Sequence, residues 1–311
     1  MSITAWLAKR KIKSVFEHFD RLQAKVADGD VKQKTNVFTG GLDALTSKMK
    51  DITDVPGVTV EAIETEGFVG DLVKTADTKS DRAILFLHGG GYIWGTARHF
   101  HDTAMRLSKL TGAAVLLPTY SLAPQHKYPT QLNEATAAFD YLIGLGIAPS
   151  KITLLGDSAG GNLAFALAQR LVEDRSAADQ PASMVLYSPW LDLTGEAPSV
   201  MGNAKKDIML RPHGIRASGA LFKGDLDFDD PRVSPLFGKM EGLPPTHIQA
   251  SSDEILLDDS TRVADRLKAA GVEVDLMVWK GLWHDFQQSA AVVPESKKAL
   301  AKTADFIVSH W

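Results

Sequence analysis

Short apolar runs that alternate with helical segments constrain the fold of this 311-residue chain more than any other feature. Six such runs predict strands at residues 83–87, 113–117, 152–155, 184–187, 246–250 and 275–279. Helical patterns follow at residues 102–110, 131–145, 162–175, 259–270 and 295–309. This alternation indicates a mostly parallel sheet with helices on both faces. An earlier pair of runs, 58–64 and 68–74, turns at Gly67 and predicts an antiparallel hairpin, which makes eight strands in all.

Two parts of the chain do not follow this rhythm. Residues 3–26 have apolar side chains at helical spacing, and a second helix is expected at 41–51. Residues 191–245 contain several prolines and glycines and are too long for an ordinary connection. We expect the whole chain to form a single α/β domain, in which residues 1–51 and the insertion at 191–245 build a cap over the carboxyl edge of the sheet.

Composition and charge exclude several classes of function. The net charge of -4 gives no general attraction to nucleic acid. The absence of cysteine excludes disulfides, thiolate catalysis and cysteine-ligated metals. No apolar run approaches the roughly 18 residues that a bilayer span requires, and the N-terminus is too polar and basic for a signal peptide. We therefore expect a cytoplasmic protein without an integral membrane segment.

The basic run at residues 9–13 allows two interpretations. On an amphipathic helix it can lie on an anionic membrane. Alternatively it is the solvated face of a helix that covers its own protein, which is the commoner case.

The sequence Gly-Asp-Ser-Ala-Gly at residues 156–160 lies between a predicted strand and a predicted helix. In that context the pattern is typical of a nucleophile elbow, a sharp turn that exposes a serine at the carboxyl end of a strand. The alternative is a glycine-rich turn without a chemical role. The elbow interpretation predicts Ser158 as the nucleophile of a covalent acyl transfer.

An acyl-transfer serine needs a histidine base and an acid that orients it, and in this strand–turn–helix arrangement they follow the serine in the order acid, histidine. Of nine histidines only His284 and His310 lie beyond the last predicted strand, and His310 is next to the chain end. We therefore predict His284 as the base. Asp253 directly follows the strand 246–250 and is the predicted acid. Asp258 is the competitor, with a helix N-cap as its alternative role.

Three glycines after the strand 83–87 predict an oxyanion site. Gly89, Gly90 and Gly91 follow His88, and glycines leave backbone N–H groups unobstructed. A phosphate-binding loop is the alternative, but no accompanying phosphate-binding motif is present. His88 is expected to be a structural residue and not a second base.

The chain resembles the hormone-sensitive-lipase family of α/β-hydrolase carboxylesterases. The resemblance covers roughly residues 84–286 and rests on the motifs at 88–92, 120–126 with 128–129, 156–162, 188–190 and 253–258. It implies hydrolysis of short- or medium-chain esters, no cofactor and no metal. It also implies a triad of Ser158, Asp253 and His284. The implied oxyanion donors are the N–H groups of Gly90, Gly91 and Ala159, with Gly89 adjoining. The family usually has arginine and glutamate where Ser121 and Gln125 stand.

Substrate choice is poorly specified by the sequence. Candidate pocket residues, each with ordinary core packing as its alternative, are Trp94, Trp190, Met209, Leu210, Leu221 and Phe222. A lactone hydrolase would use the same machinery, and a receptor of this fold would bind a small molecule without cleaving it. The expected partner is a small-molecule ester. A homodimer could form through the edge strand near 272–279.

Overall fold

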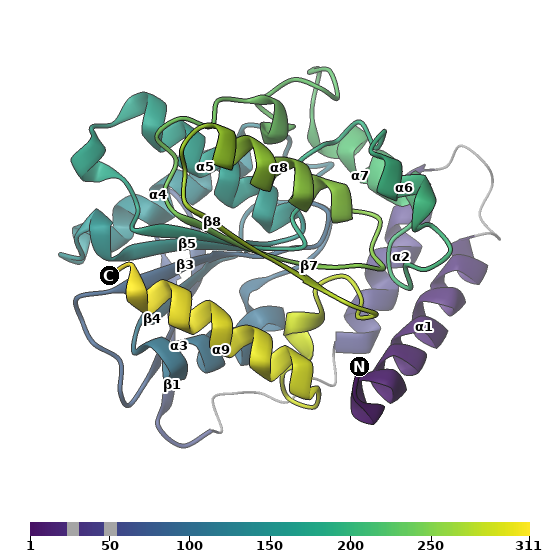
Figure 1. Cartoon of the computed structure of the whole chain (residues 1–311), viewed down its shortest axis with the longest axis horizontal. Coiled ribbons are helices and arrows are strands. Elements are labelled where there is room, and N and C mark those ends of the chain that lie inside the picture. Colours follow the sequence, from purple (N-terminus) through teal and green to yellow (C-terminus); the bar gives the residue numbers. More distant parts are fainter. Residues whose placement is uncertain (24–30, 47–54) are drawn as a thin grey trace.

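One eight-stranded sheet runs through the computed structural model, which describes residues 1–23, 31–46 and 55–311 (Figure 1). The strands are β1 (Val58–Glu64), β2 (Val69–Thr75), β3 (Ala83–Leu87), β4 (Ala114–Pro118), β5 (Ile152–Asp157), β6 (Ser183–Tyr187), β7 (Thr246–Ser251) and β8 (Val274–Trp279). Their order across the sheet is β1-β2-β4-β3-β5-β6-β7-β8. The strands β1 and β2 pair antiparallel, β2 pairs antiparallel with β4, and all later pairs are parallel. The predicted α/β-hydrolase sheet is thereby confirmed, with β8 at one edge.

Helices cover both faces of the sheet, as the alternation predicted. These helices are α3 (His101–Thr111), α4 (Thr130–Gly144), α5 (Ala159–Asp174), α8 (Leu257–Ala269) and α9 (Pro294–Ser309). In Figure 1, α4, α5 and α8 lie on one face, and α3 and α9 lie on the other. Because both faces are covered, every residue of β3, β5 and β6 is buried.

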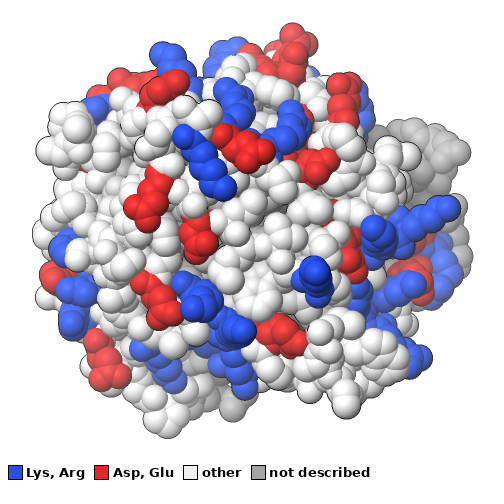
Figure 2. Space-filling model, viewed as in Figure 1, with Lys and Arg blue, Asp and Glu red and all other residues white. Residues whose placement is uncertain are grey.

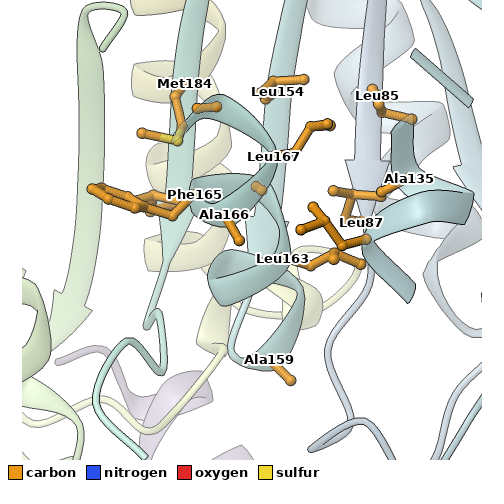
Figure 3. Close-up of a cluster of buried hydrophobic side chains, with 14 of the residues drawn as sticks. Leu85, Leu87, Ala135, Leu154, Ala159, Leu163, Phe165, Ala166, Leu167 and Met184 are labelled. Carbon is orange, nitrogen blue, oxygen red and sulfur yellow. The ribbon is translucent and has the colours of Figure 1, made fainter. Parts of the chain in front are cut away.

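Alternate residues of the central strands face the two helical layers. Leu85 and Leu154 belong to the cluster under α4, α5 and α8, whereas Ile84 and Leu155 belong to the cluster under α3 and α9. Figure 3 shows part of the first cluster, where side chains of α5 such as Leu167 lie against the strands. The helix that follows Ser158 is therefore fixed to the sheet by its apolar face, which holds the elbow rigidly.

The N-terminal helices are α1 (Ile3–Gln23) and α2 (Val31–Thr46). The helix predicted at 41–51 thus begins ten residues earlier than expected, because the consecutive glycines at 40 and 41 lie inside the helix instead of before it. Residues 47–51 of that prediction lie outside the described residues. Within the described ranges, no helix is both long and apolar enough to cross a bilayer.

The insertion at 191–245 contains α6 (Pro198–Gly202) and α7 (Pro212–Phe222) and, as predicted, no strand. In Figure 1 both helices lie at the same end of the sheet as α1 and α2, and Arg211, next to α7, binds Asp20 of α1. The Asn203 amide donates to the carbonyl of Glu254, just beyond the end of β7, at 2.9 Å. The insertion is therefore tied to the edge where the parallel strands end, which is where ligands bind in open α/β sheets.

Candidate active site

Ser158 stands on a strained turn between β5 and α5. Its backbone has φ 53° and ψ -119°, a conformation that L-residues rarely adopt. Two hydrogen bonds hold it there: the Ser158 N–H donates to the Tyr187 carbonyl at 2.9 Å, and the Trp190 N–H donates to the Ser158 carbonyl at 3.0 Å. The neighbouring strand β6 and the loop after it therefore fix the strained serine from one side.

The two glycines of the elbow are required by close backbone packing. A Cβ atom on Gly156 would lie 2.1 Å from the Gly160 carbonyl oxygen, and one on Gly160 would lie 2.0 Å from the carbonyl oxygen of Leu87. Both distances are far below van der Waals contact, and both obstacles are backbone atoms. The Gly-x-Ser-x-Gly pattern therefore reflects a local steric requirement of this turn.

Glu254, and not Asp253, contacts the predicted base. The Oε2 atom of Glu254 lies 2.8 Å from Nδ1 of His284, and both side chains are buried. The other oxygen of Glu254 accepts the Ser251 N–H at 2.7 Å. A carboxylate that accepts at both oxygens holds the ring of His284 in one orientation. The ring then carries a proton on Nδ1, and Nε2 is the nitrogen that takes part in proton transfer.

The geometry contradicts the expected pairing of Asp253 with His284. The Oδ2 atom of Asp253 lies 2.7 Å from the Lys9 ammonium of α1, which also donates to the Gly281 carbonyl at 2.8 Å. Asp258 accepts the Ser199 N–H at 2.7 Å and so fastens α6 to α8. A turn after β7 directs Glu254 inward and Asp253 outward. No signal in the sequence alone distinguished Glu254 from its neighbour Asp253.

A second carboxylate faces the other nitrogen of His284. The Oδ2 atom of Asp285 lies 3.0 Å from His284 Nε2, and no hydrogen bond joins Nε2 to Ser158 Oγ. Asp285 has left-handed backbone angles, with φ 53° and ψ 35°. Its side chain also interacts with that of Asp157, the residue directly before Ser158. The contact between Asp285 and Asp157 therefore joins the loop of His284 to the elbow of Ser158.

Burial and charge set the protonation of these groups. Burial alone would lower the pKa of His284, but the carboxylates of Asp285 and Glu254 outweigh it and raise that pKa well above 6.5. Burial, and then the charge of Asp285, raises the pKa of Asp157 well above 3.8. Two interacting buried carboxyl groups do not both ionise readily, which favours one proton on the pair.

The glycine loop after β3 presents two unengaged backbone donors. The N–H groups of Gly90 and Gly91, like that of Ala159 at the start of α5, have no acceptor among the described residues. The N–H of Gly89 differs, because it donates to Oδ1 of Asp157 at 3.0 Å. Gly89 is therefore excluded as a free oxyanion donor, and its role is to fix the loop to the elbow.

His88 is a structural residue in this arrangement. It is fully buried, stacks between Tyr120 and Phe100, and its Nδ1 lies 2.8 Å from the Gly89 carbonyl oxygen. Burial lowers the pKa of His88 to about 4, so the ring is neutral near pH 7.

The candidate pocket residues divide into two groups. Trp190 and Phe222 are buried, and Phe222 stacks on Tyr92 at a centroid distance of 3.6 Å, so both are core residues beside the site. Trp94 is partly exposed and donates to Asp43 of α2 at 2.7 Å. The remaining three candidates, which are partly buried and packed against the core clusters, are Met209, Leu210 and Leu221.

The helix α7 lies directly over the glycine loop. The hydroxyl oxygen of Ser218 in α7 lies 3.3 Å from the position that a Cβ atom would take on Gly91. One side chain of the insertion, Ser218, therefore lies beside the glycine loop.

Ser121, which stands where the family usually has arginine, forms its hydrogen bonds with a nearby residue. The Ser121 hydroxyl and N–H both donate to Glu134, at 2.6 and 2.7 Å. A serine that donates to the Glu134 carboxyl group therefore stands where the family usually places an arginine, and this contact does not involve Asp157.

Comparisons with known proteins agree with this geometry. A family model described as alpha/beta hydrolase fold matches residues 84–288. An esterase of Acinetobacter venetianus is 36% identical over 255 residues, which cover 82% of this chain and 83% of the relative. A crystal structure of EstE5 soaked with p-nitrophenyl butyrate has a TM-score of 0.88 at 29% identity and covers 100% of this chain and 99% of that one. A crystal structure of an esterase from the bacterial hormone-sensitive lipase family has a TM-score of 0.85 at 29% identity, with 97% of both chains covered. An elbow serine, a buried histidine–carboxylate pair and these relatives together show that the chain belongs to the α/β-hydrolase family, among the hormone-sensitive-lipase-like esterases.

Proposed function

We propose that this chain is a serine carboxylesterase that hydrolyses short- to medium-chain esters through an acyl-enzyme on Ser158. The observation that carries the proposal is the strained elbow of Ser158 next to unengaged N–H groups, with the buried His284–Glu254 pair on the neighbouring loop. Here Glu254 takes the role that the sequence had suggested for Asp253.

Catalysis begins when His284 removes the Ser158 proton and Oγ attacks the ester carbonyl carbon. The carbonyl oxygen becomes an oxyanion, which accepts hydrogen bonds from Gly90, Gly91 and Ala159. Each such donor is worth about 3 kcal/mol of transition-state stabilisation. His284 then gives the proton to the leaving alcohol as the tetrahedral intermediate collapses to the acyl-enzyme. Water attacks this ester by the same proton path, and the acid is released.

The contact between His284 and Asp285 implies a preceding rearrangement. The Asp285 carboxylate, 3.0 Å away, stabilises a proton on Nε2. His284 must therefore release that proton and turn away from Asp285 before Nε2 can accept the Ser158 proton. Hydrogen bonds in unliganded sites are often poorly aligned and improve when the substrate binds.

The cap of about residues 1–51 and 191–245 is proposed to limit the acyl chain. Support comes from Trp94, which is tied to α2, and from Leu210 and Leu221 on the insertion, all only partly buried. A similar protein, EstE5, was soaked with p-nitrophenyl butyrate, which makes the butyrate ester a suitable first substrate.

Two further proposals come from the sequence. The edge strand β8, extended to residues 272–279, could pair with a second copy in a homodimer, because it has a neighbour on one side only. A cytoplasmic location stays a prediction.

Hydrolysis of p-nitrophenyl esters from acetate to laurate tests the function. We expect activity to be highest for short or medium chains, and Ser158→Ala to lower kcat by at least about a thousandfold. Wild-type turnover by Ser158→Ala, with folding verified by circular dichroism, would refute the mechanism.

A further inference from the structure

The outer face of α1 exposes large apolar side chains at its beginning. Ile3, Trp6 and Leu7 are 80%, 46% and 56% exposed, and Met1, just before the helix, is 58% exposed. Residues spaced by three and four positions share one side of a helix. These four residues form a single apolar tip. Nowhere else along the described chain do four such exposed side chains occur within seven residues.

The opposite face of α1 holds the helix against the protein. Ala5 and Phe16 are buried there. Lys9 binds Asp253 and the carbonyl of Gly281, in the two loops that carry Glu254 and His284. The packing of the protein therefore accounts for the inner face of α1, and it leaves the apolar tip exposed to solvent.

Basic side chains follow the apolar tip along the same helix. Arg10, Lys11 and Lys13 are all exposed, and the guanidinium group of Arg10 lies 4.7 Å from the ring centre of Trp6. No acidic residue occurs before Glu17. Figure 2 shows Lys and Arg side chains gathered at the right edge of the molecule, where Figure 1 places α1. The local charge is thus opposite in sign to the net charge of -4.

We propose that the outer face of α1 docks on an anionic lipid surface. The tip supplies tryptophan and aliphatic side chains, which enter the boundary between headgroups and acyl chains. The basic residues supply attraction to lipid phosphates, and their long side chains extend to the headgroups. A protein partner would also cover apolar residues, but the adjoining exposed cations specifically match a negatively charged bilayer.

Docking in this way would bring the catalytic loops close to the lipid. Lys9 joins the inner face of α1 to the loops of Glu254 and His284, so the helix that contacts lipid also contacts the site. An apolar ester dissolved in the bilayer would then lie near the cap. The docking itself does not depend on esterase activity.

Vesicle cosedimentation of the full chain tests the proposal, with Ser158→Ala as the background so that no lipid is hydrolysed. We expect binding to vesicles of phosphatidylcholine with phosphatidylglycerol, and at least about tenfold weaker binding to phosphatidylcholine alone. Trp6→Ser/Leu7→Ser and Arg10→Glu/Lys13→Glu should each weaken binding to the mixed vesicles by at least about tenfold.

Two matched controls separate the α1 face from general stickiness. Met201→Ser/Val292→Ser removes exposed apolar side chains elsewhere, and Lys239→Glu/Lys268→Glu reverses exposed charges elsewhere. Both should bind like the parent, and thermal unfolding should verify that every variant is folded. Absence of binding to mixed vesicles, or equal loss in the controls, would overturn the proposal. A wild-type dimer that Trp6→Ser/Leu7→Ser dissociates would assign the face to a second copy and would overturn it as well.

Discussion

The most specific prediction concerns the acid that orients His284, which is Glu254 in the structure and not Asp253. Glu254→Gln keeps the size of the side chain but not its pattern of acceptors. Both oxygens of Glu254 accept a hydrogen bond, from the Ser251 N–H at 2.7 Å and from His284 Nδ1 at 2.8 Å. In either orientation, the amide NH₂ group of glutamine must face one of these two donors. The substitution therefore leaves one buried donor without an acceptor, or forces His284 into the wrong tautomer.

The magnitude follows from this geometry. Loss of the orienting carboxylate in a serine triad costs about 10⁴ in kcat in the serine proteases, and we expect about 10²–10⁴ here, or ~3–5 kcal/mol. Asp253 is different, because its side chain is 24% exposed and its partner Lys9 is 19% exposed. A partly exposed ion pair of this kind is worth at most about 1 kcal/mol, so Asp253→Asn should lower kcat by less than about fivefold.

Steady-state hydrolysis of p-nitrophenyl butyrate by the two variants, with unfolding temperatures measured alongside, provides the test. The reasoning predicts that only Glu254→Gln loses kcat by two orders of magnitude or more. If Asp253→Asn were the more damaged variant while remaining folded, the assignment of Glu254 would be refuted.

Three further predictions concern the surroundings of the site. Asp285→Asn removes a negative charge 3.0 Å from His284 Nε2. Because that charge helps to raise the pKa of His284, the acidic limb of the pH profile of kcat/KM should move to lower pH. An unchanged acidic limb would contradict the proposed contact. Gly160→Ala puts a methyl group 2.0 Å from the Leu87 carbonyl oxygen and should lower Tm by about 6 °C or more. The control Gly144→Ala, which has open space around the new methyl group, should not lower Tm in this way. Equal Tm values for the two variants would disprove the steric argument. Lys9→Met breaks the link from α1 to the catalytic loops and should lower Tm by about 2 °C while kcat falls less than tenfold. A loss as large as that of Glu254→Gln would instead make Lys9 part of the catalytic machinery.

Most of the sheet was predictable because its strands are buried on both faces. Residues 83–87 and 152–155 are continuous apolar runs bounded by turn residues, and the structure places β3 and β5 there. The elbow could be predicted because close backbone packing requires both of its glycines: Gly156 lies against Gly160, and Gly160 lies against Leu87 of β3. Periodicity was less useful for α2, where a helix was expected from residue 41 and the structure begins it at Val31.

The acid could not be assigned from the sequence because the choice depends on long-range contacts. Asp253 and Glu254 are neighbours, and either could follow β7 as the orienting residue. The deciding contacts are Lys9, some 240 residues earlier, which binds Asp253, and His284, which binds Glu254. Likewise, the sequence did not reveal that Asp157 would engage the N–H of Gly89.

Catalysis by the proposed mechanism requires a covalent bond to Ser158. Intact-mass spectrometry after treatment with a fluorophosphonate, followed by peptide mapping, measures whether that bond forms. We predict one adduct per chain, located on Ser158, and none on Ser158→Ala or on protein unfolded before treatment. Folded wild-type protein that stays unlabelled, or a Ser158→Ala variant labelled to the same extent, would contradict the account.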